Sequence, residues 1–274
     1  MITYTASPQP VASFAWADRP LVSFITVTYG TGDVIVGSMQ ALADTTGHLA
    51  TEVIVVDNPH PERQHSGADR LALETSGILV VRPDHNLGFG GGNELGALYA
   101  RGELLCFVNP DLITTPGWFD ALHAVIDAEP DCIAAPRLVN ADGTLQEAGQ
   151  QLLANAHTRP ITTDSDGRVD YASAACWLMT RSLHERVGGF DARFHPAYFE
   201  DVDLALRVRR LGGRTIIADV EVTHLLGGST AASETPPAEQ QRTVLQHLWA
   251  DELRRQPPGL KLASRRAKTG QPPG

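Results

Sequence analysis

The sequence has few cysteines and no long apolar run, and each absence excludes a class of protein. No segment approaches the roughly 18 consecutive apolar residues that a membrane-spanning helix needs. The three cysteines, Cys106, Cys132 and Cys176, are isolated in apolar stretches, and no Cys-x-x-Cys pair occurs. This usage indicates buried, reduced thiols in a cytoplasmic protein and disfavours a disulfide framework or a zinc site. Residues 1–19 have no basic start followed by an apolar core, so we expect no secretion signal there.

The chain also lacks an excess of positive charge. Its formal net charge is -10 over 274 residues, so its surface repels nucleic acid and anionic membranes. We therefore expect no nucleic-acid partner. The segment 256–274 is rich in proline, glycine and basic residues, which predicts a disordered basic tail. That tail allows at most a peripheral contact with the inner face of a membrane.

Apolar strands and helices alternate along the first half of the chain. The pattern predicts strands at residues 21–28, 51–57, 78–81 and 104–108, and helices at residues 33–46, 68–74, 91–101 and 117–128. Such alternation is typical of an α/β protein with right-handed crossovers. We expect a doubly wound, mostly parallel sheet with helices on both faces.

The pattern changes after residue 136. Residues 138–170 are polar and predict irregular structure with a turn at residues 140–143. Further strands are predicted at residues 172–180 and 214–218, and helices at residues 181–187, 201–211 and 239–255. We therefore expect one domain over residues 20–255, after an extension at 1–19, with halves at about 20–136 and 137–255.

Polar residues follow three of the predicted strands. Thr28-Tyr29-Gly30, Asp57-Asn58 and Asn109-Pro110-Asp111 stand where these strands stop. A single aspartate at a strand end is more often a cap or a turn residue, but parallel sheets bind ligands beyond the carboxyl ends of their strands. Proline restricts the backbone before Asp111, whose carboxylate suits Mg²⁺ or Mn²⁺. Three polar strand ends at one edge therefore favour a ligand site.

The segment from Asn86 to Asn93 is glycine-rich without being a dinucleotide fingerprint. Counting from Gly88 and Gly90, the third glycine position is Asn93, and the segment follows the third predicted strand rather than the first. The glycines permit a close approach of backbone to a ligand, with amides near a helix start available to phosphate. A flexible loop before a helix is the alternative.

Two further features have candidate chemistry. The aromatic pair Tyr198-Phe199 directly precedes the carboxylates Glu200-Asp201. A carboxylate beside apolar side chains can act as a general base. Capping of a helix start is the simpler explanation of the same carboxylates. His224 stands before Gly227-Gly228-Ser229-Thr230 and offers a nitrogen ligand, while a lone histidine is usually structural. His60 and His65, in a proline-rich turn, are expected to be solvated.

In this order and spacing the motifs resemble glycosyltransferase family 2, whose fold is GT-A. The resemblance runs from about residue 21 to residue 230. It includes the segments 24–29, 53–58, 86–93, 109–111, 187–191, 200–204 and 224–230. The combination of Asn-Leu-Gly-Phe-Gly, Asn-Pro-Asp and Gly-Gly-Ser-Thr is similar to the rhamnosyltransferase-like branch, which typically uses dTDP-L-rhamnose.

The resemblance implies a role for each motif. Asp201 matches the catalytic base and Glu200 its neighbour; Asp111 matches the metal-binding member of the family's Asp-x-Asp element, with Asn109 in place of the first aspartate. His224 matches a histidine that joins the metal site in some members, although Leu225 stands where many relatives have a second histidine. The implied nucleotide-sugar-binding residues are Thr28, Tyr29, Gly30, Asp57, Asn86, Gly90, Asn93, Asn109 and Trp177. Residues 20–136 are then the nucleotide-binding half, and residues 137–255 the acceptor and catalytic half.

The implied reaction is a single inverting displacement that depends on Mg²⁺ or Mn²⁺. A dTDP- or UDP-linked sugar is the implied donor, and a glycan, lipid-linked or small-molecule hydroxyl is the acceptor, as in cell-wall or polysaccharide biosynthesis. Two alternatives remain from the residues themselves. A sugar nucleotidyltransferase would need a basic glycine-rich loop after the first strand, and residues 29–33 contain no Lys or Arg. A catalytically silent binding module of the same fold would be expected to lack Glu200-Asp201.

Overall fold

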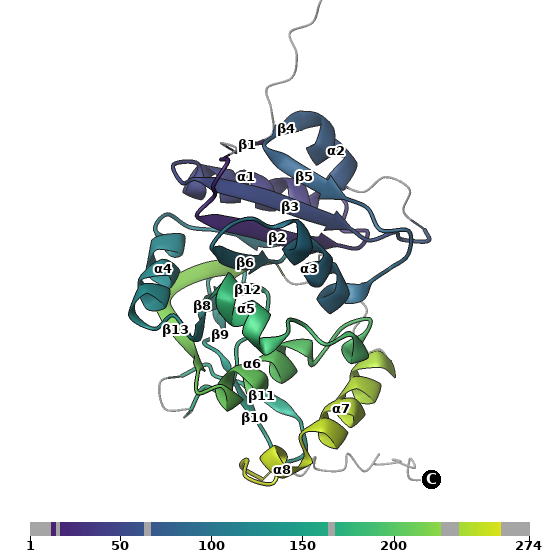
Figure 1. Cartoon of the computed structure of the whole chain (residues 1–274), viewed down its shortest axis with the longest axis vertical. Coiled ribbons are helices and arrows are strands. Elements are labelled where there is room, and N and C mark those ends of the chain that lie inside the picture. The colour runs from purple at the N-terminus through teal and green to yellow at the C-terminus, as the bar shows by residue number, and fades with distance from the viewer. Residues whose placement is uncertain (1–11, 15–16, 63–66, 164–167, 226–235, 259–274) are drawn as a thin grey trace, which may run out of the picture.

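The computed structural model describes residues 12–14, 17–62, 67–163, 168–225 and 236–258. Within these residues, a mixed nine-stranded sheet runs in the order β5-β3-β2-β6-β12-β8-β13-β7, with β9 paired to β8 (Figure 1). Its strands are β2 (Val22–Thr28), β3 (Thr51–Asp57), β5 (Ile78–Val81), β6 (Leu104–Val108), β7 (Leu112–Ile113), β8 (Cys132–Val139), β9 (Leu145–Glu147), β12 (Cys176–Thr180) and β13 (Arg214–His224).

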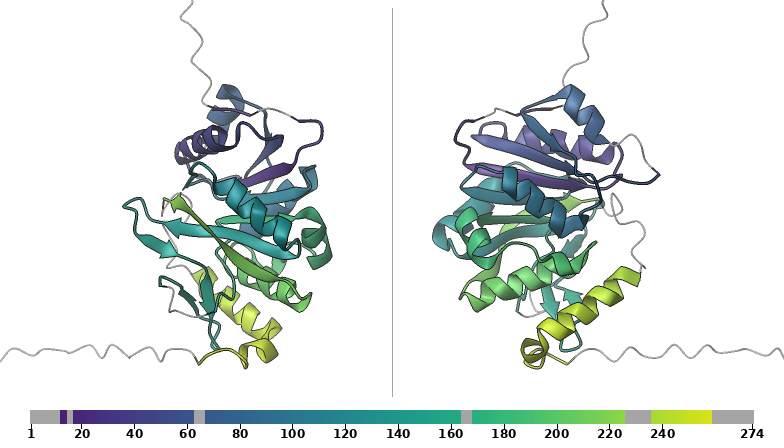
Figure 2. Two further views of the ribbon diagram at one scale, coloured as in Figure 1. Left: turned by 90° about the vertical axis from the view of Figure 1, so that its left-hand side faces the viewer. Right: turned by 45° about the vertical axis from the view of Figure 1, so that its right-hand side comes forward.

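The helices lie where the alternation predicts them, and the α/β class is confirmed. They are α1 (Val34–Thr46), α2 (Gly67–Glu74), α3 (Gly88–Tyr99), α4 (Trp118–Ala128), α5 (Arg181–Val187), α6 (Glu200–Arg210), α7 (Pro236–Leu248) and α8 (Ala250–Leu253). In all views α7 and α8 lie at the end of the molecule opposite to α2 (Figures 1 and 2). None of the described helices is both long and apolar enough to cross a bilayer.

The strands β5, β3, β2 and β6 pair in parallel, as predicted for the first half of the chain. Every residue of β2, β3 and β6 is buried, because helices cover both faces of this part of the sheet. Side chains alternate between the faces along each strand. Phe24 therefore belongs to one hydrophobic core and Ile25 to the other.

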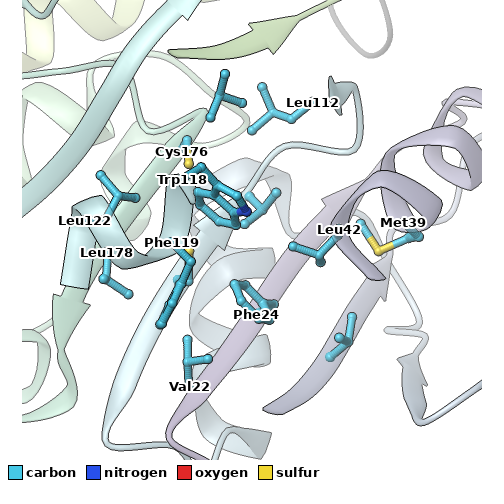
Figure 3. Packing of buried hydrophobic residues seen from close by; sticks show 14 of the residues in the cluster. Val22, Phe24, Met39, Leu42, Leu112, Trp118, Phe119, Leu122, Cys176 and Leu178 are labelled. Carbon is cyan, nitrogen blue, oxygen red and sulfur yellow. The ribbon is translucent and has the colours of Figure 1, made fainter. Parts of the chain in front are cut away.

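Helices α1 and α4 cover the first core, where aromatic rings pack around β2 (Figure 3). The ring of Phe24 lies 6.0 Å from that of Trp118 and 5.8 Å from that of Phe119, centroid to centroid. Residues of α5, α6 and α7 belong to the second core, and Phe89 and Leu95 of α3 pack against it. All three cysteines are buried and free, as predicted from their isolation.

The strand β8 contradicts the sequence-based expectation that the pattern breaks at Pro136. Because proline lacks an N–H, it interrupts a ladder, and this sheet accommodates it with an irregularity in the neighbouring strand. The register of β13 shifts between Ile217, opposite Ala135, and Glu221, opposite Arg137. Eight residues of β8 thus continue through the proline, and the expected boundary at residue 136 falls inside a strand.

The second half of the chain contains more strand than predicted. Residues 138–170 contain β9 and the hairpin of β10 (Gln150–Leu152) with β11 (Thr158–Pro160), where irregular structure was expected. The strand expected at 172–180 begins only at Cys176, and β12 runs antiparallel to both β6 and β8. The predicted strand 214–218 extends to His224, because β13 goes on to pair with β7. In the extension, β1 (Ala12–Ser13) pairs with β4 (Thr75–Ser76).

Helix α3 begins at Gly88, earlier than predicted, and its glycines let it pack close to β2. A Cβ atom on Gly96 would lie 2.4 Å from Ile25 Cγ2, and one on Gly92 would lie 2.8 Å from Val27 Cγ1. These distances are shorter than any ordinary carbon–carbon contact. Larger residues at these positions would force the helix away from the sheet.

We therefore expect Gly96→Ala to lower the free energy of unfolding by about 1–3 kcal/mol, the usual cost of overpacking. Gly37→Ala is the matched control, because a Cβ atom there meets nothing within 4 Å on an exposed position of α1. Removing that glycine should stabilise the protein by about 0.5–1 kcal/mol. Urea denaturation measures both, and equal effects would contradict the close packing of α3.

Candidate active site

A cavity of about 460 Å³ opens beyond the carboxyl ends of the parallel strands. It combines residues from distant parts of the chain, as expected for a site at this edge of an α/β sheet. Its lining residues are Val27, Tyr29, Asn58, Asn86, Gly88, Phe89, Asn109, Ser173, Ala174, Ala175, Pro196, Ala197, Tyr198, Glu200, Asp201 and His224.

The backbone of residues 173–175, which we name the strap, connects the parts of the cavity wall. Ser173 N donates to Glu147 Oε1 at 3.0 Å, and the amide of Ala174 hydrogen-bonds to the Asp201 carboxylate. Ala175 O accepts from Asn109 N at 2.8 Å. Three consecutive strap residues therefore hold β9, the start of α6 and the end of β6 together.

The carboxylates of Glu200 and Asp201 stand at the first turn of α6, as predicted, and both line the cavity. Tyr198 and Phe199, directly before them, have positive φ values of 84° and 68°. This left-handed conformation costs non-glycine residues free energy and is enriched at functional sites. The strained pair turns the chain so that α6 begins with its carboxylates on the cavity wall.

Burial and charge act on these carboxylates in the same direction. Burial, with a smaller contribution from the charge of Glu147, raises the pKa of Asp201 to about 7, while the amides of Val202 and Ala174 oppose the shift. Burial, and next the charge of Asp201, raise the pKa of Glu200 well above its usual range. Asp201 therefore titrates near neutral pH, and its buried neighbour Glu200 is shifted in the same direction, toward its neutral form.

The third carboxylate of this motif, Asp203, has a different environment. It is buried and accepts hydrogen bonds from Trp249 Nε1 at 2.7 Å and Arg207 Nε at 2.8 Å. Arg210 lies over the ring of the same tryptophan, 3.8 Å from its centroid. Asp203 thus links Trp249, between the two C-terminal helices, to α6, and it is not among the described residues that line the cavity.

Asp111 and His224 meet because β7 pairs with β13, with Leu112 opposite His224. Asp111 is buried, and its Oδ1 lies 3.3 Å from His224 Nε2. This distance exceeds the roughly 2.8 Å of a charge-assisted hydrogen bond. No hydrogen bond reaches Asp111 Oδ1 from the described part of the chain. Gln146 Oε1 lies 3.1 Å from the other ring nitrogen, His224 Nδ1.

The glycine-rich segment contacts the loop before α6 rather than presenting free amides. A Cβ atom on Gly88 would lie 2.3 Å from Pro196 O, and that oxygen accepts from Phe89 N at 2.7 Å. The amide of Gly88 donates to Asn86 Oδ1 at 2.8 Å. Two amides at the start of α3 are therefore already in use, and the segment positions the loop that leads to Glu200.

Three of the residues predicted at strand ends line the cavity, namely Tyr29, Asn58 and Asn109. Asp57 lies beside them at the end of β3, where its Oδ2 accepts from Arg82 Nε at 3.2 Å. Thr28 is fully buried and hydrogen-bonds to the Thr31 hydroxyl. Gly30 is buried as well and turns the chain after β2 with a φ of 64°.

Trp177 and Asn93 are buried and are not among the described residues that line the cavity, so their part in donor binding stays a prediction. Trp177 is fully buried, stacks on Phe190 and donates its indole N–H to Ala172 O at 3.2 Å, so it supports the strap from behind. Asn93 is also buried and donates to Phe89 O within α3. Gly90 faces Phe190 and Glu200, with its Cβ position 3.2 Å from Phe190 Cβ. Apolar residues cover these positions, because α3 packs directly on the core.

Sequence reasoning noted Asn58 at a strand end but gave it no role, and it missed the strap, Gln146 and Glu147. Asn58 joins β3 to the glycine-rich segment by accepting from Leu87 N at 2.9 Å and donating to Gly88 O at 3.2 Å. Its place beside Asp57 at a strand end was a usable signal. The strap, Gln146 and Glu147 gave no such signal, because their contacts are with residues far along the chain. His65, the segment 227–230 and most of the tail lie outside the described residues.

The fold matches solved glycosyltransferases. A structure of GalNAc-T7 with UDP, GalNAc and Mn²⁺ superposes with a TM-score of 0.70 at 14% identity, covering 86% of this chain and 50% of that one. Staphylococcus aureus TarS 1-349 in complex with UDP-GlcNAc gives a TM-score of 0.63 at 17% identity, covering 86% and 67%. The fold is therefore GT-A, the fold of a large class of glycosyltransferases.

The sequence identifies the family within that class. The pattern of glycosyl transferase family 2 matches residues 23–188, and the chain belongs to this family. The family resemblance and the GT-A fold expected from the motifs are confirmed.

Two curated relatives match most of this chain. The N-acetylglucosaminyl-diphospho-decaprenol L-rhamnosyltransferase of Mycobacterium tuberculosis is 25% identical over 244 residues, covering 75% of this chain and 76% of the relative. The O-antigen biosynthesis protein RfbC of Myxococcus xanthus is 26% identical over 253 residues, covering 85% of this chain. The chain spans 20% of the length of RfbC and 26% of that of the y4gI protein of Sinorhizobium fredii.

The core placement of Trp177 has a measurable consequence. We expect Trp177→Phe to lower the free energy of unfolding by about 1–3 kcal/mol, through lost packing and the lost hydrogen bond, without weakening UDP binding. Trp118→Phe is the matched control, because Trp118 is equally buried and donates to Thr45 Oγ1 in the other core. Denaturation and calorimetric titration measure the two effects. A UDP affinity that falls only in Trp177→Phe would place the indole on the ligand.

Proposed function

We propose that this protein is an inverting transferase that moves a sugar from a nucleoside-diphosphate donor to an acceptor hydroxyl. One observation carries the proposal: a cavity at the strand ends is lined by both Asp201 and His224, and the ring of His224 lies 3.3 Å from the buried Asp111 carboxylate. Asp201 is the general base, since its pKa of about 7 suits proton transfer near neutral pH. The acceptor oxygen, once deprotonated, attacks the anomeric carbon in line, and no covalent enzyme intermediate is needed.

The donor set at the end of β6 fits a divalent cation. Asp111 Oδ1 is buried and accepts no hydrogen bond from the described residues, and His224 Nε2 faces it. Carboxylate and imidazole are both ligands that Mn²⁺ or Mg²⁺ sites use, and the donor diphosphate supplies the remaining oxygens. No group of three or more candidate ligands occurs among the described residues. Asp111 and His224 would therefore hold the ion together with the diphosphate, whose leaving charge the ion neutralises when bound.

The charge of the cavity wall also favours a cation. Among the described lining residues, none is Lys or Arg, whereas Glu200 and Asp201 are acidic. A diphosphate brings negative charge to a wall that offers it no Lys or Arg side chain, so a bound cation would offset that charge.

The remaining polar residues of the strand ends suit the nucleoside. We assign Tyr29 and Asn109 to the cavity side of this subsite, and Asp57, with Arg82 beside it, to the base or ribose. Asn86 completes the wall next to Gly88. The donor we favour is dTDP-L-rhamnose, on the motif resemblance and the rhamnosyltransferase relative. The acceptor would be a lipid-linked or glycan hydroxyl, by the same analogy.

A nucleotide-sugar panel tests the function directly. Thermal shift with dTDP-, UDP- and GDP-linked sugars, each with and without Mn²⁺, should raise the melting temperature for the true donor in the presence of Mn²⁺. Stabilisation by none of the nucleoside diphosphates would contradict the proposal. Release of nucleoside diphosphate on addition of a glycolipid acceptor then measures transfer.

The titration of Asp201 predicts the pH dependence of transfer. A base works only when deprotonated, so kcat/KM should rise with pH up to about 7 and then level off. Asp201→Asn should bind the donor normally and lose about 10²–10⁴-fold in kcat. Glu200→Gln is the comparison variant: it keeps the Asp201 carboxylate, so kcat/KM should still rise with pH through an inflection. A pH profile unchanged in Asp201→Asn would exclude this base.

The metal assignment has its own test. Asp111→Ala should remove the Mn²⁺-dependent part of UDP or dTDP binding while leaving metal-free binding as it was. Titration calorimetry with and without Mn²⁺ separates the two contributions. Asp201→Asn serves as the control, because that residue is not assigned to the ion. An intact Mn²⁺ effect in Asp111→Ala would refute the site.

A further inference from the structure

The strand β9 contacts both parts of the proposed site, although neither Gln146 nor Glu147 is among the described residues that line the cavity. It lies in the segment that the sequence leaves irregular. Its pairing with β8 through Leu138, and the pairing of β8 with β13, fix it against the strand that ends in His224. The edge of the sheet therefore determines where the side chains of β9 lie.

Gln146 controls the orientation of the His224 ring. Its Oε1 is an acceptor, so His224 Nδ1 carries the proton that this contact needs, at 3.1 Å. The lone pair of Nε2 then points toward Asp111, 3.3 Å away. Acceptors of this kind fix the tautomer and direction of ligating histidines, and their loss weakens metal binding.

Glu147 controls the strap. The side chain is buried; Oε1 accepts from Ser173 N at 3.0 Å, and Oε2 accepts from Gln150 Nε2. The next amide along the strap, that of Ala174, hydrogen-bonds to Asp201. If Glu147 were displaced, the Ser173 amide would lose its hydrogen bond. The next amide, that of Ala174, would then be less firmly held against the Asp201 carboxylate.

Successive side chains of a strand point to opposite faces. One short strand can therefore reach the histidine with Gln146 and the strap with Glu147, and any shift of the strand moves both contacts together. The geometry of the two halves of the site is then set by a single element.

We propose that Gln146 and Glu147 are positioning residues, Gln146 for His224 and Glu147, through the strap, for Asp201. This inference rests on the function proposed above. It assigns a role in the reaction to a strand that touches neither the donor nor the reacting atoms.

Manganese binding tests Gln146. Gln146→Met keeps the length of the side chain and removes the acceptor, whereas Gln146→Glu keeps an acceptor. Electron paramagnetic resonance of Mn²⁺ with UDP or dTDP should show about tenfold weaker binding of the ion to Gln146→Met. Gln146→Glu should stay within about threefold of the native protein, and metal-free nucleotide binding should not change in either. Native Mn²⁺ affinity in Gln146→Met would overturn this half of the proposal.

Transfer kinetics test Glu147. Glu147→Met removes the acceptor for Ser173 N, and a displaced base should lower kcat by about tenfold or more with the donor KM nearly unchanged. Glu147→Gln keeps an oxygen for that amide and should restore most of kcat. Equal losses in the two variants, or a loss in KM alone, would show that Glu147 does not act through the strap.

Gln151→Met is the matched control. Gln151 is a buried amide on the neighbouring strand β10, where it accepts from Arg159. The same substitution there should change neither Mn²⁺ affinity nor kcat, and an equal effect would make Gln146 and Glu147 merely structural. If the native protein itself binds no nucleoside diphosphate and transfers no sugar, the proposed function fails, and this inference with it. If the native protein is active and all variants match it, only the inference fails.

Discussion

The site depends on the hydrogen bonds of one short stretch of backbone, the strap at residues 173–175. The strap contacts three distant parts of the chain. The amide of Ser173 contacts Glu147, the amide of Ala174 contacts Asp201, and the carbonyl of Ala175 contacts Asn109. Backbone groups make these contacts, so the side chains need only be small enough to leave the cavity open. Trp177 fills the space behind the strap and keeps it from moving inward.

The parts of the fold that sequence could predict are those determined by local patterns. Apolar runs give β2, β3 and β6, because a parallel strand covered on both faces needs an apolar residue at nearly every position. The polar strand ends Tyr29 and Asn109 follow from the same reasoning, and both lie on the cavity wall. Glu200 and Asp201 were found by their motif and also lie there.

The parts that sequence could not predict depend on pairings between distant segments. The strand β8 continues through Pro136 because the register of β13 shifts opposite it. The residues around the proline give no sign of that shift, which lies far along the chain. The meeting of His224 with Asp111 needs β7 to pair with β13. The glycines between Asn86 and Asn93 predict a close approach of backbone to a ligand, and in the structure Gly88 makes room for Pro196 O, as Gly96 further along α3 does for Ile25. Glycine allows close approach of any partner, and its position alone does not say which.

The electrostatics of the site connect its two halves. Burial and the charge of Glu147 raise the pKa of Asp201 to about 7, and burial together with the charge of Asp201 raises the pKa of Glu200. The same negative surroundings that make Asp201 a stronger base also oppose a diphosphate. In the proposed function, a cation held by Asp111 and His224 would offset the charge of the donor, and the burial that strengthens Asp201 as a base would also strengthen the attraction between that cation and the diphosphate.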